Sequence, residues 1–483
     1  MKGYFFRKIG LFVLELTCIT HVSFFCERYQ FNVLLLSYSI AFGVYFYFLR
    51  NLKVADIKLA LIFAVLARFI AIFSTPHLSD DFFRFFWDGS LTLNGINPYI
   101  FKPTDLQPWL STQNETVKYA FSKMNSPDYN SVYPPIAQSV FATAVFLFPK
   151  SIYGATVFIK FINFLAECGT LYFLYKLTKK INPKAVLVYS LNPFLIVELC
   201  GNAHTEALMI VFFAAALYYL QKFPPYKVGT DSGRQLSETF VPSSLDGLSK
   251  SVGGEKKSMF LAGLFLALST ASKLFVLLYV LFFARNLNFR KGIYFMGVFT
   301  IACIIFFIPF FQTIFSPTLR NNSLGLFFNR FEFNASVFYI LKFFGEWLYG
   351  FDTIHLVSPI LMCIFIVFAI ILHLKKSFFT TDLQTFSRAC LMLFYAYIIC
   401  STTVHPWYLA FPVFFAAMSG YYFPLVHSFF IVLSYAGYSQ GSSKSIENLW
   451  FVLIEYSVVL VVFLFEQNPS TYQTKRSKSR QEI

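Results

Sequence analysis

The sequence carries few charged side chains for its length. Of 483 residues only 13% are charged, whereas 57% are hydrophobic and the mean hydropathy is +0.60. A soluble domain carries roughly 25% charged residues, so a soluble chain of this composition could not cover its own surface. Lipid in place of water removes that difficulty. The composition therefore excludes an ordinary soluble protein and indicates a polytopic membrane protein.

Paired cysteines and acidic residues are also scarce. The eight cysteines form no Cys-x-x-Cys pair and lie mostly in apolar segments, so neither a disulfide framework nor a zinc site is expected. The 39 Lys and Arg outnumber the 24 Asp and Glu, which gives a net charge of +15. These basic residues lie between apolar runs, where they set topology and meet anionic headgroups. The positive charge therefore indicates membrane lipid as a partner and no nucleic acid.

Apolar segments long enough to cross a bilayer, about 17–25 residues each, recur along the whole chain. The apolar stretch 259–284 is interrupted by Lys273, and we expect two short helices that meet there. The sequence predicts an all-α fold, a polytopic transmembrane bundle of about 12–14 spans. Besides the two halves of 259–284, the expected spans are 9–25, 31–49, 57–73, 152–176, 184–200, 205–221, 292–310, 354–373, 388–403, 406–420, 424–440 and 449–465.

The Lys and Arg clusters orient these spans, because cytoplasmic loops are enriched in both residues. A single assignment of the spans places every Lys and Arg cluster on the cytoplasmic side, provided that 135–149 lies along the membrane interface and does not cross the membrane. Residues 74–134, rich in Pro, Asn, Asp and Tyr, then form a long outer loop. Residues 222–257, rich in Ser, Gly and Pro, are expected to be a disordered cytoplasmic loop.

The chain thus divides into six parts by composition. They are the N-terminal helices 1–73, the outer loop 74–151 with its interfacial helices, the helices 152–221, the loop 222–257, the C-terminal helices 258–466 with an outer loop at 311–353, and the basic cytoplasmic tail 467–483.

Two adjacent carboxylates, Asp80 and Asp81, begin the long outer loop. Arg84 lies three residues beyond Asp81, so on a helix both would project from one face. A carboxylate beside an arginine stays ionised and can deprotonate or orient a sugar hydroxyl, while the arginine can bind a phosphate. The same residues also suit a helix start, with Ser79 or Asp80 as the N-cap. Both interpretations remain open, and they are compatible.

Turn motifs follow in the same loop and complete a recognisable pattern. The loop holds Trp87-Asp88-Gly89, Gly95-Ile96-Asn97-Pro98-Tyr99 and Tyr133-Pro134-Pro135. Together with Asp80, Asp81 and Arg84, these motifs resemble the first outer loop of GT-C glycosyltransferases. The greatest similarity is to bacterial polyprenyl-phosphate-mannose-dependent mannosyltransferases, and a more distant one is to the GPI mannosyltransferases. Specific matching covers about residues 75–145, and the remainder matches in layout only.

The resemblance implies a multi-span helical enzyme that takes a sugar, here mannose, from a polyprenyl-phosphate lipid. The acceptor would be a glycan, a glycolipid or a protein, at the non-cytoplasmic face of a bacterial cytoplasmic membrane. Asp81 would be the base that activates the acceptor, with Asp80 beside it, although some relatives carry an Asp-Glu pair and leave this choice open. Transfer would invert a β-linked sugar phosphate into an α-glycoside. The resemblance also implies these substrate-binding residues in the loop: Arg84, Trp87, Asp88, Asn97, Tyr99 and Tyr133.

An isolated lysine, Lys273, lies between two apolar half-helices. An intramembrane lysine is costly and is a functional candidate by default. The resemblance implies that it binds the lipid phosphate, and the alternative is a side chain that snorkels to the interface.

Two further polar positions fall at outer turns. His204 and Glu206 could bind sugar hydroxyls, or a divalent metal if a third ligand is present, or could form a plain polar turn. His405 and Tyr408, which open another span, are also expected to bind substrate, and the alternative is the aromatic belt that is common at this depth. Arg320 and Arg330, in the outer segment 311–335, could meet a phosphate or be solvated. No cofactor is firmly implied.

Two other classes of protein compete with the enzyme. A transporter or flippase would place polar or broken helices near the bilayer midplane, whereas here the charged residues collect at one face. A membrane scaffold would tolerate replacement of Asp80 and Asp81. We therefore expect a glycosyltransferase.

Overall fold

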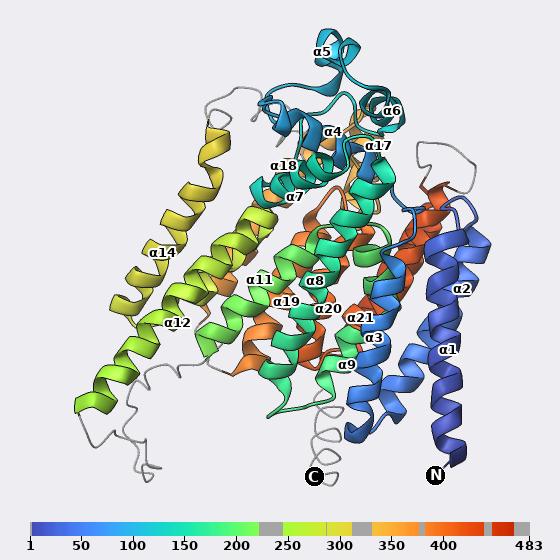
Figure 1. Cartoon of the computed structure of the whole chain (residues 1–483). Helices are drawn as coiled ribbons and strands as arrows, with labels where there is room; N and C mark the ends of the chain where they lie inside the picture. Colours follow the sequence, from blue (N-terminus) through green and yellow to red (C-terminus); the bar gives the residue numbers. More distant parts are fainter. Residues whose placement is uncertain are drawn as a thin grey trace.

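The computed structural model describes residues 2–221, 245–285, 287–311, 331–375, 382–438 and 447–467. The described backbone is helical and contains no β-strand beyond an isolated bridge between Phe333 and Thr403. The helices pack side by side into a bundle that carries a compact cap of short helices at one end (Figure 1). The expected all-α polytopic bundle is confirmed. We call the end of the bundle that carries this cap the loop end.

The N-terminal half of the bundle consists of helices that run between the loop end and the opposite end (Figure 1). The long helices are α1 (Lys2–Phe25), α2 (Phe31–Asn51), α3 (Ile57–Ala71), α8 (Ile152–Thr178) and α11 (Glu206–Gln221). Short pieces connect them: η1 (Val54–Asp56), α9 (Ala185–Ser190), α10 (Pro193–Leu195) and the π-helical η3 (Ile196–Gly201).

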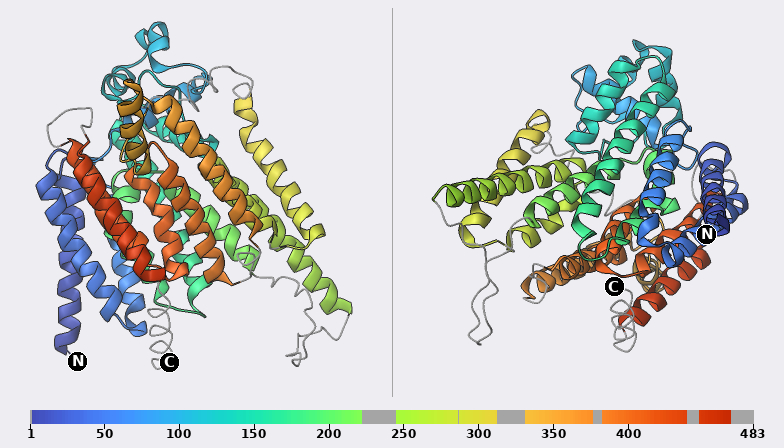
Figure 2. Two further views of the ribbon diagram at one scale, coloured as in Figure 1. Left: turned by 180° about the vertical axis from the view of Figure 1, so that it is seen from behind. Right: turned by 60° about the horizontal axis from the view of Figure 1, so that its bottom comes forward.

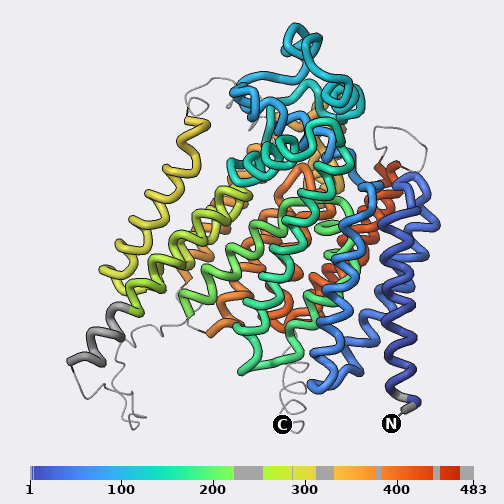
Figure 3. The backbone as a smooth tube through the Cα atoms, in the orientation of Figure 1, coloured from blue at the N-terminus to red at the C-terminus, as the bar shows by residue number. Residues whose placement is uncertain are grey.

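Between α3 and α8 the chain leaves the bundle and builds the cap (Figure 3). The cap comprises α4 (Asp81–Leu93), η2 (Pro103–Leu106), α5 (Gln107–Ser111), α6 (Glu115–Lys123) and α7 (Pro135–Leu147). It has its own hydrophobic core, centred on Phe85, Trp87 and Phe141. Gly89 allows α4 to approach α7, since a Cβ there would lie 2.5 Å from the carbonyl oxygen of Phe141. Helix α7 lies across the end of the bundle (Figure 1), as expected of an interfacial helix.

The C-terminal half adds α12 (Leu245–Ser272), η4 (Leu274–Tyr279), α13 (Val280–Arg285), α14 (Phe289–Phe307), η5 (Ile308–Phe310), α17 (Val337–Tyr349), α18 (Ile354–Leu374), α19 (Leu383–Cys400), η8 (Pro406–Leu409), α20 (Ala410–Ser419), α21 (Phe423–Phe430), η9 (Ile431–Tyr438) and α22 (Leu449–Gln467). Helix α22 returns from the loop end, because Phe451 lies 5.5 Å from Phe31, between ring centroids, while Glu466 accepts hydrogen bonds from Tyr422 and Phe423 at the other end. The start of α1 and the end of α22 therefore lie at the same end of the bundle (Figure 2).

Part of the segment expected to be disordered is helical. Helix α12 begins at Leu245, so residues 245–257 extend the spanning helix beyond its apolar part, and Glu255 pairs with Lys291 of α14. Once a helix has been nucleated, each further residue adds a hydrogen bond at little cost, which is why it continues past the apolar sequence. The rest of that segment, 222–244, lies outside the described residues, as do 312–330 of the second outer loop and 468–483 of the tail.

Seven helices of the described chain are long and apolar enough to cross a membrane. An eighth span results if α10–η3 and α11, which are bent by 114° at their junction, count as one. This count includes only long continuous helices, so a shorter apolar helix such as α3, which also runs between the two ends of the bundle (Figure 1), is not in it. In the most apolar parts of the α14–η5 segment and of α22, only 17% and 11% of the residues are buried. Their exposed apolar side chains therefore require lipid. The chain is a multi-pass membrane protein.

We predict that the loop end faces the non-cytoplasmic side. Ser111, exposed on α5 of the cap, should react as Ser111→Cys with a membrane-impermeant thiol reagent added to intact cells. Lys180→Cys, exposed after α8 at the opposite end, should react only after permeabilisation. Labelling of Ser111→Cys only after permeabilisation would contradict this orientation.

Candidate functional site

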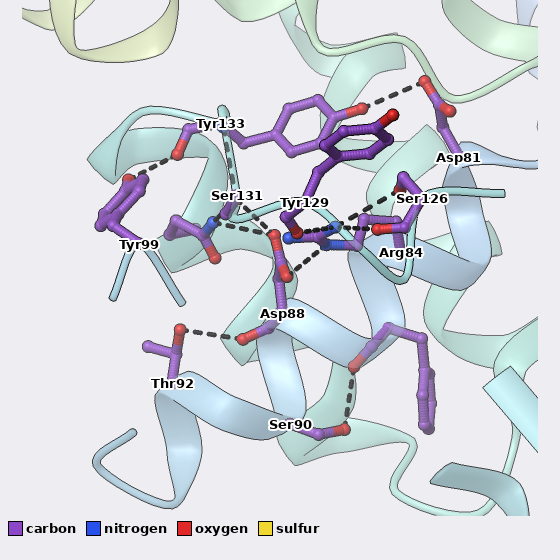
Figure 4. A network of polar contacts seen from close by, with 12 residues as sticks. Asp81, Arg84, Asp88, Ser90, Thr92, Tyr99, Ser126, Tyr129, Ser131 and Tyr133 are labelled. Atoms are coloured by element: carbon purple, nitrogen blue, oxygen red, sulfur yellow. Dashed lines mark hydrogen bonds and ion pairs between the residues drawn. The ribbon is translucent and has the colours of Figure 1, made fainter. Parts of the chain in front are cut away.

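Side chains from five separate segments meet where the cap rests on the bundle. Asp81 opens α4, and Tyr133 precedes α7. The hydroxyl of Tyr133 donates a hydrogen bond to Asp81 Oδ2 at 3.0 Å (Figure 4). Lys273 Nζ lies 2.6 Å from Glu206 Oε1 and 5.8 Å from the ring centroids of both Tyr133 and Tyr408. Asp81 and Lys273 thus lie next to the same tyrosine.

Asp81 is held by neutral hydrogen-bond donors. Besides Tyr133, Asn125 Nδ2 donates to Asp81 Oδ1 at 3.4 Å, and the backbone N–H of Asp81 is bonded to Ser79 Oγ at 3.3 Å. Burial, with the charge and hydrogen bond of Asp81, raises the pKa of Tyr133 well above its ordinary value. Tyr133 therefore stays protonated, and it orients the Asp81 carboxylate as a donor.

Asp80 has a different environment from its neighbour. Its carboxylate lies 2.5 Å from the guanidinium of Arg28 in the loop between α1 and α2, and Arg28 also stacks over the ring of Tyr438 at 4.7 Å. Asp80 occupies the N-cap position of α4 but makes no side-chain cap hydrogen bond, since Arg28 holds its carboxylate. The side chain of Asp80 ties the first helical hairpin to the cap.

The expected approach of Arg84 to Asp81 is not seen. The Arg84 side chain points into the cap instead. Its Nε donates to Asp88 Oδ1 at 2.7 Å, and its Nη1 donates to the carbonyl oxygens of Ser126 and Tyr129, both at 2.9 Å (Figure 4). Only 4% of the Arg84 side chain is exposed. A buried guanidinium needs a counter-charge and several acceptors, and the interior of the cap supplies them.

Asp88 lies at the centre of the same network. It is fully buried, and its Oδ2 accepts from Ser131 Oγ at 2.5 Å and from Gln138 Nε2 at 3.2 Å. The pair of Arg84 and Asp88 therefore joins α4, α7 and the loop before α7. In this position Asp88 stabilises the cap.

The remaining cap residues expected to bind substrate are also engaged within the cap. Trp87 is fully buried against Trp109. Asn97 Oδ1 accepts from the backbone N–H of Tyr99 at 2.9 Å, and the hydroxyl of Tyr99 donates to the carbonyl oxygen of Tyr133 at 2.5 Å. The Asn97-Pro98-Tyr99 turn thus fixes the backbone that carries Tyr133.

Lys273 marks the expected break between helices. Helix α12 ends at Ser272, Lys273 is extended with φ −158° and ψ 124°, and η4 follows. The ammonium group faces Glu206 and two tyrosine rings, an arrangement that favours a cation. The side chain thus faces the base of the cap, and the sugar-binding candidate Glu206 is its counter-ion.

Four aromatic rings form a column beside Lys273. The ring of His204 stacks on Trp407 at 3.8 Å between centroids, Trp407 stacks on His405 at 4.6 Å, and His405 lies 5.4 Å from Phe333. Burial, opposed by the charge of Asp81 and reinforced by that of Lys273, lowers the pKa of His405 to about 4. His405 is therefore neutral at pH 7.

A model of a known family matches residues 32–287, more than half of the chain, and it is described as the N-terminal domain of alpha-(1->6)-mannopyranosyltransferase. The chain belongs to this family. It is a mannosyltransferase, and the resemblance drawn from the cap motifs is confirmed, which sets aside the transporter and scaffold alternatives. No curated protein and no solved structure gave a significant match.

The matched segment of this mannosyltransferase holds only part of the site. It includes Asp81, Tyr133 and Lys273, but Arg28 precedes it and the ring column of His405 and Trp407 follows it. The two halves of the chain therefore contribute jointly to one site in this mannosyltransferase.

The mannosyltransferase contains, among its described residues, no group of three or more His, Cys, Asp or Glu side chains that could hold a metal ion. His204 and Glu206 have other partners, Glu198 and Lys273. Arg320 and Arg330 lie outside the described residues. Arg28 and Glu198 were not predicted from the sequence. Glu198 stands alone in an apolar run, and an isolated charged residue of this kind indicates a functional position.

Proposed function

We propose that this mannosyltransferase is a GT-C enzyme that moves mannose from a polyprenyl-phosphate mannose lipid to an acceptor hydroxyl. The observation that carries the proposal is that a carboxylate, Asp81, and an ammonium group, Lys273, both lie next to Tyr133. Glycosyl transfer needs a base, because the attacking hydroxyl must lose a proton, and a cation, because the departing phosphate gains negative charge. A carboxylate and an ammonium group can fill these two roles.

We assign the base to Asp81. Asp80 is neutralised by Arg28, whereas the hydrogen-bond donors to the Asp81 side chain among the described residues, Tyr133 and Asn125, are both neutral. Neutral donors orient a carboxylate without removing its charge, so Asp81 keeps the capacity to accept a proton. Asp80 is then a structural partner of the base.

The donor phosphate is assigned to Lys273. An acceptor hydroxyl, with its proton passing to Asp81, attacks the anomeric carbon while the bond from that carbon to the phosphate oxygen breaks. The electron pair leaves with the lipid phosphate, whose charge Lys273 meets. A β-linked donor then gives an α-glycoside by inversion, which agrees with the α-linkage in the description of the family.

The acceptor class follows from the place of the site. The base of the cap lies at the loop end, which we infer to be the non-cytoplasmic face of a bacterial cytoplasmic membrane from the Lys and Arg clusters. A hydroxyl of a glycan, a glycolipid or a protein on that side would be the acceptor.

The direct test uses membranes with and without the protein and a mixed-acceptor membrane extract. Radiolabelled polyprenyl-phosphate mannose should pass label to the acceptor only where the protein is present. Nucleotide-linked mannose should pass none once synthesis of the lipid donor is blocked. Transfer from the nucleotide sugar under that block would contradict the lipid donor.

Lys273→Met should lower kcat/KM for the donor roughly 10- to 100-fold, because charged hydrogen bonds contribute about 1.5–3 kcal/mol. Lys273→Arg should restore part of the activity, because it keeps a cation at the site. Kinetics with polyprenyl-phosphate mannose would measure both. Lys118→Met, at a partly exposed position on the cap, is the matched control and should match wild type. An unchanged donor dependence in Lys273→Met would remove this residue from the site.

A further inference from the structure

The turn that carries His204 is strained. The chain passes from α10 into the π-helical turn η3 and then bends by 114° into α11. Within this turn Ala203, which is not a glycine, has φ 65° in the left-handed region. Single π-turns and non-glycine residues in this region are costly and cluster at functional sites. The turn places His204 in the ring column, where it stacks on Trp407.

Glu198 fixes the orientation of the His204 ring. It is fully buried in η3, its Oε2 lies 3.1 Å from His204 Nδ1, and its Oε1 accepts from the hydroxyl of Tyr435 at 2.8 Å. A carboxylate only accepts hydrogen bonds, so Nδ1 must carry the proton. In the neutral ring Nε2 is then an acceptor.

The Nε2 atom of His204 is buried and has no hydrogen-bond partner among the described residues. The His204 side chain is 2% exposed, and a buried polar atom without a partner is costly. His204 stands two residues before Glu206, the counter-ion of Lys273, and stacks on Trp407. His204 therefore lies next to the side of the site that we assign to the donor, and its Nε2 is an acceptor that no described residue uses.

We propose that Glu198 is a positioning residue. It holds His204 so that Nε2 accepts a hydrogen bond from a hydroxyl of the donor mannosyl group. The identity of that group rests on the function proposed above. The role of Glu198 is separate from it, because the orientation of the ring follows from contacts within the chain.

Two substitutions of His204 separate the two ring nitrogens. The amide of glutamine reaches the position of Nε2, whereas the shorter asparagine places its amide near Nδ1. We expect His204→Asn to raise the donor KM about 3- to 10-fold, the usual effect of losing one neutral hydrogen bond, with a smaller change in kcat. His204→Gln keeps an acceptor at the position of Nε2 but loses the contact with Glu198, so its donor KM should rise less than that of His204→Asn. Equal KM values for the two variants would overturn the proposal.

Glu198→Gln tests whether Glu198 acts through His204. It should raise the donor KM about 3- to 10-fold in the wild-type background and cause no further rise when combined with His204→Asn. A product of the two separate effects in the double variant would show that Glu198 acts elsewhere and would overturn the proposal. If Glu198→Gln fails to fold, Glu198→Asp, which keeps the charge but withdraws the carboxylate from Nδ1, takes its place, and additive effects with His204→Asn would again overturn the proposal. If wild type uses another mannosyl donor, the proposed lipid donor fails, and the same KM ratios measured with that donor still test the positioning role.

Discussion

Asp81→Asn is expected to lower the rate of mannosyl transfer by about 10²–10⁴-fold, the usual cost of losing a general base. The amide keeps the size of the side chain and an oxygen that can accept from Tyr133, but it cannot take a proton from the acceptor. Asp81 lies at the edge of the cap and is only half-buried, so the yield of folded protein should stay near wild type. The measurement is single-turnover transfer from polyprenyl-phosphate mannose by the purified variant.

Asp80→Asn is the matched control for that experiment. It removes a partly exposed ion pair with Arg28, and pairs of this kind contribute about 0–1 kcal/mol. Its transfer rate should therefore fall far less than that of Asp81→Asn. The opposite order would make Asp80 the base, and full activity in the double variant would remove both residues from catalysis.

The second large effect is on stability. Asp88→Asn should destabilise the cap by about 3–5 kcal/mol, because it leaves the buried Arg84 guanidinium without its counter-charge. Arg84→Lys should also destabilise the cap, since a single ammonium group cannot replace a guanidinium that bonds Asp88 and two carbonyl oxygens. The midpoint of thermal unfolding in detergent and the rate of proteolysis within 74–134 would measure the loss.

Glu115→Gln provides the control for the cap. Glu115 pairs with Lys118 on α6, but its side chain is 89% exposed, so the substitution should change stability by no more than about 0.5 kcal/mol. The alternative to this structural role of Arg84 is phosphate binding, which the sequence suggested. A normal unfolding midpoint for Arg84→Lys, together with weaker donor binding, would restore that role.

Arg84 pairs with Asp88 and not with Asp81 for a reason that lies in helix geometry. On α4, Arg84 is a neighbour of Asp81 at i−3 and also of Asp88 at i+4, and both spacings bring side chains together. The sequence cannot choose between the two, because the choice depends on where the cap core closes over the helix. The buried side, with Trp87 and Phe141, is the Asp88 side.

The sequence located the parts of the site that carry local signals. Lys273 interrupts an apolar run, and Tyr133 stands before two prolines, so both positions could be picked out without a structure. Arg28 carries no such signal, since it reaches Asp80 across 52 residues of sequence. Glu198 was overlooked because its apolar neighbours outweigh one carboxylate in a hydropathy window. The number of spans is harder to predict from sequence, because breaks such as the 114° bend at α11 leave hydropathy unchanged.

The division of the site between the two halves of the chain has a consequence for biosynthesis. A ribosome completes Asp81, Tyr133 and Lys273 well before it reaches His405, Trp407 and Tyr408. Until η8 has been inserted, Lys273 lacks its second tyrosine, and His204 lacks the ring on which it stacks. A chain that stops before η8 therefore lacks part of the side of the site that we assign to the donor. The proposed donor side is complete only after more than four-fifths of the chain has been synthesised.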